Sequence, residues 1–428
     1  MELALALALA LAQIIMVVTL ILMISGRTPL YLTAVIGSSI AAIVAGVPLV
    51  GKAPVTLGKL INSGLNPVLV DMTGVLLFIG VMEKAGFLNV IIKKIVVVGC
   101  KLGGGPGVAT AGGIAAGVIG ALTGFTQPAI TAVITGPAAV KLGVEPNKAA
   151  GAQSHAGTLG NYGGFTHPTQ VAVIATAGIT FGMLNVIGAI VGLTIFACSF
   201  VRLRQALKLE NPAATNVSTE EIAAGLFEQA DSVSFGIAIF PFIVLAVGFS
   251  LGYPIMFVGV LSSLIVILLA KMPLSRGEAV MLAGLTRIAT PLFATISFLF
   301  MSAVINHVGL VTLLSGWLVP YLKVGPIQIM LLVSALAGLI TQSNAASAAV
   351  VIPFLQVVMK AGSDPFAAAV VAAGGCAIMQ YYLTGGPVTA LPTVIPVIPG
   401  SELMTANKFM RPNILGGLAM LFLISFFL

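Results

Sequence analysis

The sequence predicts an all-α polytopic membrane protein with two inverted-topology repeats, each containing a re-entrant helical hairpin and a broken helix. Three observations support this fold class. The chain of 428 residues is 59% hydrophobic and only 7% charged, whereas soluble domains carry about 25% charged residues. Apolar stretches long enough to cross about 30 Å of hydrocarbon recur along the chain. The second half also repeats the charged, proline and polar interruptions of the first half at one fixed spacing.

The repeat spacing is 219 residues. Three residue pairs mark it: Lys52 and Lys271, Pro146 and Pro365, and Tyr162 and Tyr381. In a hydrophobic chain, two halves with polar interruptions at matching positions indicate a secondary transporter and point to its binding site. We divide the chain into a first transmembrane repeat at 1–202, a polar linker between the repeats at 203–232 and a second transmembrane repeat at 233–428.

Each half is expected to open with scaffold helices. The first half has predicted spans near 4–25, 29–49 and 68–85, with interfacial segments at 51–67 and 86–101. The second half has predicted spans near 233–251, 254–270 and 289–306, with shorter elements at 273–287 and 309–322. We expect the first two helices, 4–25 and 29–49, and their repeat mates to form the scaffold and the dimer contact.

A re-entrant hairpin follows in each half. Residues 107–122 form a Gly- and Ala-rich arm, which at 1.5 Å per residue is about 24 Å long and short for a full crossing. Polar residues interrupt it at 123–128, and 129–140 form the return arm. In the second half, arms at 326–340 and 348–359 flank the tip at 341–347.

A broken helix follows each hairpin. The breaks are predicted at 160–168 and 380–387, and full spans near 181–202 and 413–428 close the halves. On this count each half has an odd number of spans. An odd number inverts the second repeat relative to the first and predicts a pseudo-twofold axis in the membrane plane.

The two tips and two breaks form the predicted substrate and ion site. Unpaired backbone at membrane depth is tolerated only where it is buried in protein or lines a cavity, so the four segments should meet near the midplane. Helix N-termini there suit a carboxylate, and helix C-termini and unwound carbonyls suit Na⁺. The candidate binding residues are Thr123, Thr126, Gln127, Asn161, Tyr162, Thr166, Ser343, Asn344, Ser347, Thr384, Gly385, Gly386 and Thr389. A Na⁺ position is expected near Ser343 and Asn344.

These residues are mostly neutral hydrogen-bonding groups, which fit an anion or polyhydroxy acid better than a cation. Any single Ser or Thr could instead bond back to its own helix or serve close packing. The clusters at 123–128 and 343–347 favour function, because they recur at repeat-related positions between short arms.

Three ionisable residues are candidates for proton coupling: His155, His167 and Asp71. Ionisable groups within membrane segments are functional candidates by default, and histidine titrates near neutral pH. The alternatives are a buried histidine that is simply hydrogen-bonded and, for Asp71, a solvated cap at a span end.

The absence of several motifs argues against other classes of protein. The sequence contains no phosphate-binding loop, HExxH, GxSxG or paired-carboxylate motif, and no region polar enough for a nucleotide domain. We therefore expect a protein that is not an enzyme and has no cofactor beyond its coupling ion, H⁺ or Na⁺. Cys100, Cys198 and Cys376 lack CxxC spacing, which indicates free thiols. The net charge of +7 is thinly spread over short loops, so no nucleic-acid partner is expected.

Through this architecture the chain resembles the ion transporter superfamily of secondary carriers. Ser343-Asn344-Ala345 resembles the Ser-Asn-Thr tip signature of divalent anion:Na⁺ symporters, with Ala in place of Thr, and the first tip departs from that signature. The segments at 154–157 and 167–169 are similar to the Ser-His-Gly and Pro-His-Pro elements of gluconate:H⁺ symporter-like permeases. The resemblance implies uptake or exchange of an organic anion by a homodimer with elevator-type movement.

The leading hypothesis is therefore an H⁺- or Na⁺-coupled carrier of a small organic anion, such as a sugar acid or carboxylate. It would be a multi-pass protein of the inner or plasma membrane, in contact with the lipid bilayer. A Na⁺/H⁺ antiporter of the same superfamily is an alternative, but it would need an acidic ion site and buried carboxylates are scarce. A channel or a membrane enzyme is a further alternative.

Overall fold

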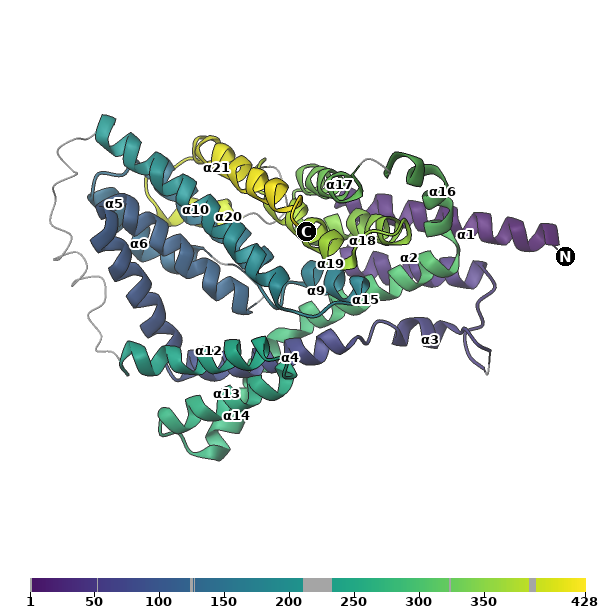
Figure 1. Cartoon of the computed structure of the whole chain (residues 1–428), viewed down its shortest axis with the longest axis horizontal. Coiled ribbons are helices and arrows are strands. Elements are labelled where there is room, and N and C mark those ends of the chain that lie inside the picture. The colour runs from purple at the N-terminus through teal and green to yellow at the C-terminus, as the bar shows by residue number, and fades with distance from the viewer. Residues whose placement is uncertain are drawn as a thin grey trace.

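The computed structural model describes residues 2–51, 53–123, 126, 128–210, 233–322, 325–384 and 390–428. Within these ranges the regular structure is helical and no strand occurs, which confirms the predicted all-α class. The molecule is elongated, and α1 projects from one end (Figure 1). Residues 203–210 of the predicted linker continue helix α10, and the rest of the linker, 211–232, lies outside the described residues.

The helices of the two halves follow each other in matching order. The first half contains α1 (Glu2–Ser25), α2 (Leu30–Val44), α3 (Leu57–Asn62), α4 (Pro67–Lys84), α5 (Phe87–Thr123), α6 (Ala129–Lys141), α7 (Pro146–Ser154), α8 (Ala156–Gly163), α9 (Pro168–Ala177) and α10 (Met183–Glu210). The second half contains α12 (Phe235–Ser250), α13 (Ile255–Leu269), α14 (Leu274–Gly284), η2 (Leu285–Ile288), α15 (Ala289–His307), α16 (Leu310–Leu322), α17 (Pro326–Thr341), α18 (Asn344–Lys360), α19 (Pro365–Met379), α20 (Ala390–Val394), η3 (Ile395–Val397) and α21 (Leu403–Ile424).

Helix starts at repeat-related positions use the same local chemistry. The Glu145 carboxylate accepts hydrogen bonds from the first backbone N–H groups of α7, and the Asp364 carboxylate accepts one from the start of α19. A proline follows each cap, at the first helical position, where its missing N–H costs no hydrogen bond. The 219-residue spacing therefore repeats capping as well as helix order.

A kink separates the two segments that precede the tip of the first hairpin, as the sequence predicted. Residues 86–101 and 107–122 both carry the label α5, but the backbone leaves helical geometry between them, at Gly103 and Gly104. Gly104 has φ +57°, a left-handed conformation that favours glycine. α4 and α5 meet at 77°, and the corresponding α15 and α16 meet at 72°.

Two helix boundaries differ from the prediction. α18 begins at Asn344 rather than 348, and α21 begins at Leu403 rather than 413. In both cases polar residues at the helix start suggested a loop, although Asn344, Asn407 and Asn413 are buried against other helices. A polar residue on the inner face of a membrane helix lowers hydropathy without ending the helix.

By length and composition, two of the described helices could each cross a membrane alone, Leu3–Ser25 and Met183–Glu210. Each of the bent pairs α4/α5 and α15/α16 could provide one further span. The other apolar helices have 10–17 residues. This length is expected of the hairpin arms α6, α17 and α18. The same group includes α2, α12 and α13, which the sequence predicted as full spans and which are shorter than a crossing requires.

The two halves interleave instead of lying apart as separate bodies. α4 packs on α13 and α14, and the repeat-related α15 packs on α2 and α3. Likewise α9 packs on α18 while α20 packs on α6, and α10 packs on α19 while α21 packs on α7. Reciprocal contacts of this kind are what a twofold relation between two repeats produces. In Figure 1, α12, α13 and α14 lie together at one edge, apart from the cluster of α17, α18, α19 and α21.

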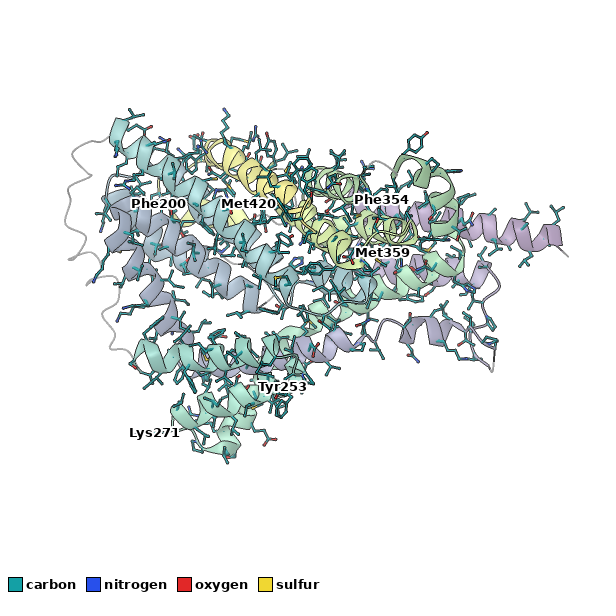
Figure 2. All side chains as sticks on the ribbon, viewed as in Figure 1. Phe200, Tyr253, Lys271, Phe354, Met359 and Met420 are labelled. Atoms are coloured by element: carbon teal, nitrogen blue, oxygen red, sulfur yellow. The ribbon has the colours of Figure 1, made fainter. Side chains whose placement is uncertain are left out.

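Small residues bring the core helices into close contact. A Cβ at Gly338 of α17 would lie 2.6 Å from the Cys376 carbonyl oxygen of α19, so only glycine fits this crossing. Close backbone approach at small residues is a main source of helix association in membranes. Side chains fill the spaces between helices, while Tyr253 and Lys271 mark the two ends of α13 at the periphery (Figure 2).

Candidate functional site

Asn344 is the centre of the second hairpin tip and is only 4% exposed. Its side-chain Nδ2 lies 3.2 Å from His167 Nδ1, and its Oδ1 accepts the Cys376 thiol at 3.0 Å. Its backbone N–H donates to Gln380 Oε1 at 2.9 Å, and its carbonyl accepts the Thr169 hydroxyl at 2.9 Å. One residue thus joins the tip to both predicted breaks, one from each repeat.

The second tip is closed by its own hydrogen bonds. Ser343 Oγ accepts the Ala346 N–H at 3.3 Å and caps α18. The Ser343 carbonyl accepts the hydroxyls of Thr341 and Ser347, at 3.0 and 2.8 Å. Gln342 turns the chain in a left-handed conformation with φ +49°. The three candidates Ser343, Asn344 and Ser347 therefore lie together, as the sequence suggested.

The expected Na⁺ position involves oxygens that already accept hydrogen bonds. Ser343 Oγ, the Ser343 carbonyl and Asn344 Oδ1 each accept a hydrogen bond from the protein. Ser343 Oγ and Asn344 Oδ1 each accept one bond and keep a second lone pair, so a Na⁺ position near Ser343 and Asn344 stays a prediction. No group of three His, Cys, Asp or Glu side chains that could hold a metal ion occurs in the part of the chain that the structure describes.

The first hairpin tip is held by close packing of Thr126 against two glycines. Thr126 Oγ1 occupies a niche between Gly120 and Gly160, where a Cβ on either glycine would lie only 2.1 or 2.0 Å from it. This oxygen is buried and has no hydrogen-bond partner among the described residues. The Thr123 hydroxyl donates back to the Ile119 carbonyl at 2.9 Å, as considered for any single Thr. Gln127 lies outside the described residues.

Asn161 and Tyr162 bind the two repeats together. Asn161 Nδ2 donates to the Tyr381 hydroxyl at 2.7 Å, and the Tyr162 hydroxyl donates to the Val370 carbonyl at 2.9 Å. Tyr162 and Tyr381 are repeat mates, so each tyrosine reaches into the opposite half. Both are buried. The structure places them where α8 packs on α19.

The unwound part of the first break is short, at 164–167, since α8 continues to Gly163. The Gly164 carbonyl accepts Asn185 Nδ2 at 2.5 Å, and the Phe165 N–H donates to the Ala121 carbonyl at 2.9 Å. The break is therefore anchored to α10 and to the first hairpin. Thr166 is fully buried, and its Oγ1 has no partner among the described residues.

His155 lies at a separate interruption, between α7 and α8. Its Nε2 is 3.0 Å from Asn413 Nδ2, and Asn413 Oδ1 accepts Arg202 Nη1 at 3.0 Å. Its ring packs edge-on against Phe196, with centroids 6.0 Å apart. Since the amide nitrogen of Asn413 can only donate, Nε2 is the acceptor and Nδ1 carries the proton. This Nδ1 is buried without a partner among the described residues.

Further polar atoms near His155 in the sequence are also buried and unpartnered among the described residues: Gln153 Oε1 and Thr158 Oγ1. Buried polar groups are hydrogen-bonded in the great majority of cases. Within the described residues, the interruption between α7 and α8 differs in this respect from Asn344, whose side-chain and backbone polar atoms all have protein partners.

Two other candidates lie outside this group. The Asp71 carboxylate accepts backbone hydrogen bonds from Ile255 and Met256, at the start of α13. This is a cap on a helix of the opposite repeat, close to the alternative role considered for it. Thr384 Oγ1 lies 3.2 Å from Met404 Sδ at the start of α21. Gly385, Gly386 and Thr389 lie outside the described residues.

Several residues of the network were absent from the sequence-based candidates. Cys376 was treated only as a free thiol, and Thr169 and Gln380 were quoted as parts of motifs without a role. Asn407 and Arg411 were hidden because the last span was expected to begin at 413. Their spacing of four residues, which places two side chains on one helix face, was the available signal.

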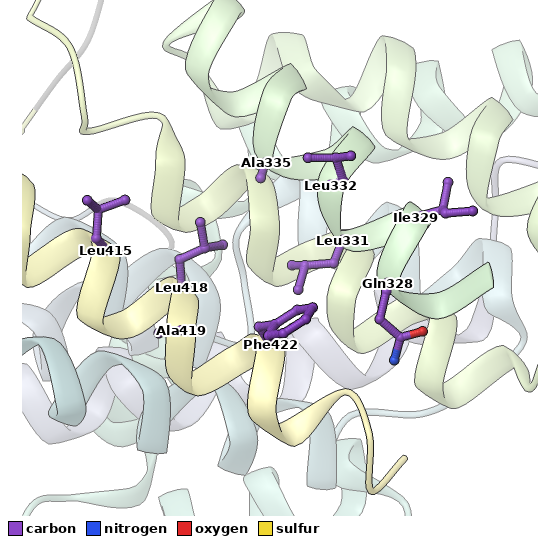
Figure 3. Close-up of a pocket in the computed structure, with 9 residues that line it drawn as sticks. All are labelled: Gln328, Ile329, Leu331, Leu332, Ala335, Leu415, Leu418, Ala419 and Phe422. Atoms are coloured by element: carbon purple, nitrogen blue, oxygen red, sulfur yellow. The ribbon is translucent and has the colours of Figure 1, made fainter. Parts of the chain in front are cut away.

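A groove of about 530 Å³ lies away from the tips, between α17 and α21 (Figure 3). Leucine, isoleucine, alanine and phenylalanine line it, with Gln328 as its polar residue. Gln328 Nε2 is already 3.2 Å from the Ser425 carbonyl. The groove therefore offers little to a polar substrate, and the chemistry lies with the buried network.

Comparisons with known proteins show the fold. No protein-family model and no curated protein sequence matches the chain. The structure is similar to that of the YdaH transporter of Alcanivorax borkumensis, with a TM-score of 0.57, 16% identity and 86% of each chain covered. It is also similar to MtrF of Neisseria gonorrhoeae, with a TM-score of 0.62, 15% identity and coverage of 93% of this chain and 95% of MtrF. The chain thus shares its fold with solved membrane transport proteins.

Proposed function

We propose that this protein is a secondary active transporter that couples H⁺ or Na⁺ to the movement of a small organic anion across the inner or plasma membrane. The observation that carries the proposal is the convergence of the second hairpin tip and both helix breaks around Asn344. Such breaks are built at great cost in a membrane, and transporters use them as binding sites. The shared fold with YdaH and MtrF supports the same conclusion.

The chemistry of the site favours an anion that bears hydroxyl groups or a carboxylate. Amide, hydroxyl and thiol groups dominate it, and the nearby charged side chains of α10 and α21 are basic, Arg202 and Arg411. A sugar acid or simple carboxylate could exchange its hydrogen bonds with water for bonds to these groups. A cationic substrate would find no carboxylate among the contacts described for Asn344.

The contact between His167 and Asn344 suggests how a proton could be coupled. Neutral His167 accepts from Asn344 Nδ2 through Nδ1. Protonation would place two donors 3.2 Å apart, since both imidazolium nitrogens carry hydrogen. The tip would then lose its link to the first break. In a Na⁺-coupled mechanism, the ion would instead bind the Ser343 and Asn344 oxygens described above.

For alternating access we propose an elevator-type movement. The hairpins and broken helices would form the moving unit, and α1, α2, α4 and their repeat mates the fixed scaffold and homodimer contact. The interleaving of α4 with α13 and of α15 with α2 supports a scaffold made by both repeats. Because α4 and α15 each pack on helices of the other repeat, the scaffold would stay together while the core moves.

Export is the second candidate direction. MtrF is described as illuminating a class of antimetabolite efflux pumps, and this chain shares its fold. The narrower likeness to gluconate:H⁺ symporter-like permeases has no support from the two solved structures. The antiporter alternative is weakened because Asp71 caps α13, and no catalytic set favours an enzyme.

Uptake into proteoliposomes tests the proposal. Purified protein would be assayed with labelled gluconate, succinate and citrate under an imposed pH gradient or Na⁺ gradient, in both membrane orientations. Gradient-dependent movement of at least one acid is the expected result, and its direction separates uptake from export. Absence of any gradient-dependent movement by folded protein would reject the proposal, and a conductance far above carrier turnover in planar bilayers would indicate a channel.

A further inference from the structure

The start of α21 carries two polar side chains that face the second break. Asn407, only 1% exposed, donates through Nδ2 to the Tyr381 carbonyl at 3.2 Å. Arg411 donates through Nε to Asn407 Oδ1 at 2.9 Å, and its guanidinium carbon lies 5.5 Å from the centre of the Tyr382 ring. A guanidinium over an aromatic face is held in place while its remaining N–H groups stay available.

The repeat shows that this arrangement is not required for packing. The positions 219 residues earlier are Gly188 and Gly192 of α10. A Cβ at Gly188 would lie 2.2 Å from the carbonyl oxygen of Tyr162, and one at Gly192 would lie 2.9 Å from Leu159. The first repeat thus packs glycine against the tyrosine carbonyl. In the second repeat the Asn407 amide donates to the corresponding carbonyl, that of Tyr381, and the Arg411 guanidinium donates in turn to Asn407.

Arg411 also differs from the other basic residues nearby. Arg202 donates through one nitrogen to the Phe409 carbonyl and Asn413 Oδ1, and so connects α10 to α21. Lys148 pairs with the Glu210 carboxylate. Lys408 is exposed on the outer face of α21. Within the described residues, the hydrogen bond that Arg411 makes is to the neutral Asn407, and no carboxylate pairs with it.

The break places Arg411 beside the hairpin-tip network. Gln380 accepts the Asn344 N–H, and the next residue, Tyr381, accepts both Asn161 at its hydroxyl and Asn407 at its carbonyl. Arg411 is thus two hydrogen bonds from the Tyr381 backbone. Its side chain is half-buried, as is Tyr382. A half-buried cation without an acidic partner, next to an unwound helix, is suited to a transient anionic ligand.

We propose that Arg411 binds the carboxylate of the transported substrate at the second break, oriented by Asn407 and the Tyr382 ring. This inference rests on the proposed function and adds a specific recognition residue to it. The two Nη groups present the parallel donors that pair with both oxygens of a carboxylate. The two repeats therefore have different roles: the first packs its helices closely through glycines, and the second binds the negative charge of the substrate.

Ligand-dependent thermal stability of the purified full-length protein tests Arg411. Gluconate, succinate and citrate would each be titrated over the millimolar range, because a ligand that binds the folded state raises its melting temperature. The Arg411→Gln variant should lose the shift given by the acid that stabilises the native protein. Arg411→Lys should bind that acid at least about tenfold more weakly, because the ammonium cannot form the paired contact.

Lys408→Gln is the matched control, since it removes the same charge from the same helix on its exposed face. It should bind with native affinity, which excludes a general effect of net charge. If Arg411→Gln does not fold, the comparison of Arg411→Lys with the native protein decides. Native affinity in the folded Arg411 variants, or an unchanged KM for uptake, would overturn the inference while leaving the transport proposal intact. If the native protein neither binds nor transports any of the three acids, both proposals fail.

Discussion

The two breaks of this protein occupy equivalent places in a repeated fold but are built from different chemistry. In the first, α10 packs on α8 through Gly188 and Gly192, and the Tyr162 carbonyl accepts Gln170 Nε2 at 2.8 Å. In the second, Asn407 and Arg411 stand at the same positions and contact Tyr381 and Tyr382. A duplicated scaffold can therefore keep its helix order while only one copy acquires charged recognition.

The two hairpin tips differ in the same manner. The tip at Asn344 uses the hydrogen-bonding groups of its side chain and backbone, whereas Thr126 is held by glycine niches with its hydroxyl unpartnered among the described residues. A ligand or ion can replace the hydrogen bonds of Asn344 one at a time. The packing of Thr126 between two glycines cannot be replaced stepwise in this way. This contrast suggests that the second tip moves or binds and the first acts as a support.

The largest effect is expected from Gly188→Ala. The new Cβ would lie 2.2 Å from the Tyr162 carbonyl oxygen. Because this neighbour is a backbone atom, the clash can be relieved only by moving α8 away from α10. Overpacking in a core costs about 1–3 kcal/mol or more, so the melting temperature in detergent should fall sharply. Gly236→Ala on α12, where nothing lies within 4 Å, is the control and should leave it unchanged or slightly raised. Equal stability of the two variants would contradict the close packing of the first break.

Asn344→Ala should abolish most transport and reduce stability less than Gly188→Ala. The change removes the partner of His167 Nδ1, at a cost of about 1–3 kcal/mol. The Cys376 thiol loses its bond to Asn344 Oδ1 but keeps the Ala372 and Ala373 carbonyls as acceptors. Uptake in proteoliposomes and the melting temperature measure the two effects. Thr126→Ser, which keeps the oxygen in its niche, is the comparison in the first tip. If that variant lost as much transport as Asn344→Ala, the division between moving and supporting tips would be wrong.

The two histidines should separate in their effect on coupling. His167→Gln should remove the dependence of uptake on a pH gradient, because this histidine contacts the tip through Asn344. His155→Gln should keep that dependence, since its ring bridges α7 and α21 through Asn413 away from the tip. Uptake with and without an imposed pH gradient distinguishes them. The reverse outcome would assign proton coupling to the interruption between α7 and α8.

The smallest effect is expected from Asp71→Asn. Its carboxylate caps the start of α13, and a negative charge at a helix N-terminus contributes about 0.3–1 kcal/mol. The melting temperature should fall slightly and uptake of the organic acid should persist. Loss of Na⁺/H⁺ exchange in this variant, measured with a pH-sensitive dye in vesicles, would instead revive the antiporter hypothesis.

The order of elements was predictable because it depends on local signals. Hydropathy, proline and glycine placed both hairpins and both broken helices, and the 219-residue spacing aligned α7 with α19 and α10 with α21. Errors arose where a polar residue faced inward. Asn407 and Arg411 on α21 looked like a loop in the sequence because hydropathy counts a polar side chain without knowing which face it occupies.

The composition of the site was predictable only in part. Ser343, Asn344 and Ser347 lie together because they are neighbours in the chain, and neighbours stay close in any fold. His167 joins Asn344 across 177 residues, and Asn161 joins Tyr381 across 220. Such contacts depend on how the repeats interlock, which no local pattern encodes.

The sequence by itself determined the class of the protein, the order of its helices and the places of the second hairpin tip and the first break, since these follow from how apolar and chain-breaking residues are spaced. It did not predict the interruption at His155. Only the tertiary structure decided which side chains meet at each interruption. Gly188 and Asn407 are ordinary residues of two apolar helices when taken alone. Their roles become visible only in the folded protein, where Gly188 packs against the Tyr162 carbonyl and Asn407 donates to the Tyr381 carbonyl. Packing distance and hydrogen-bond direction are properties of the assembled helices.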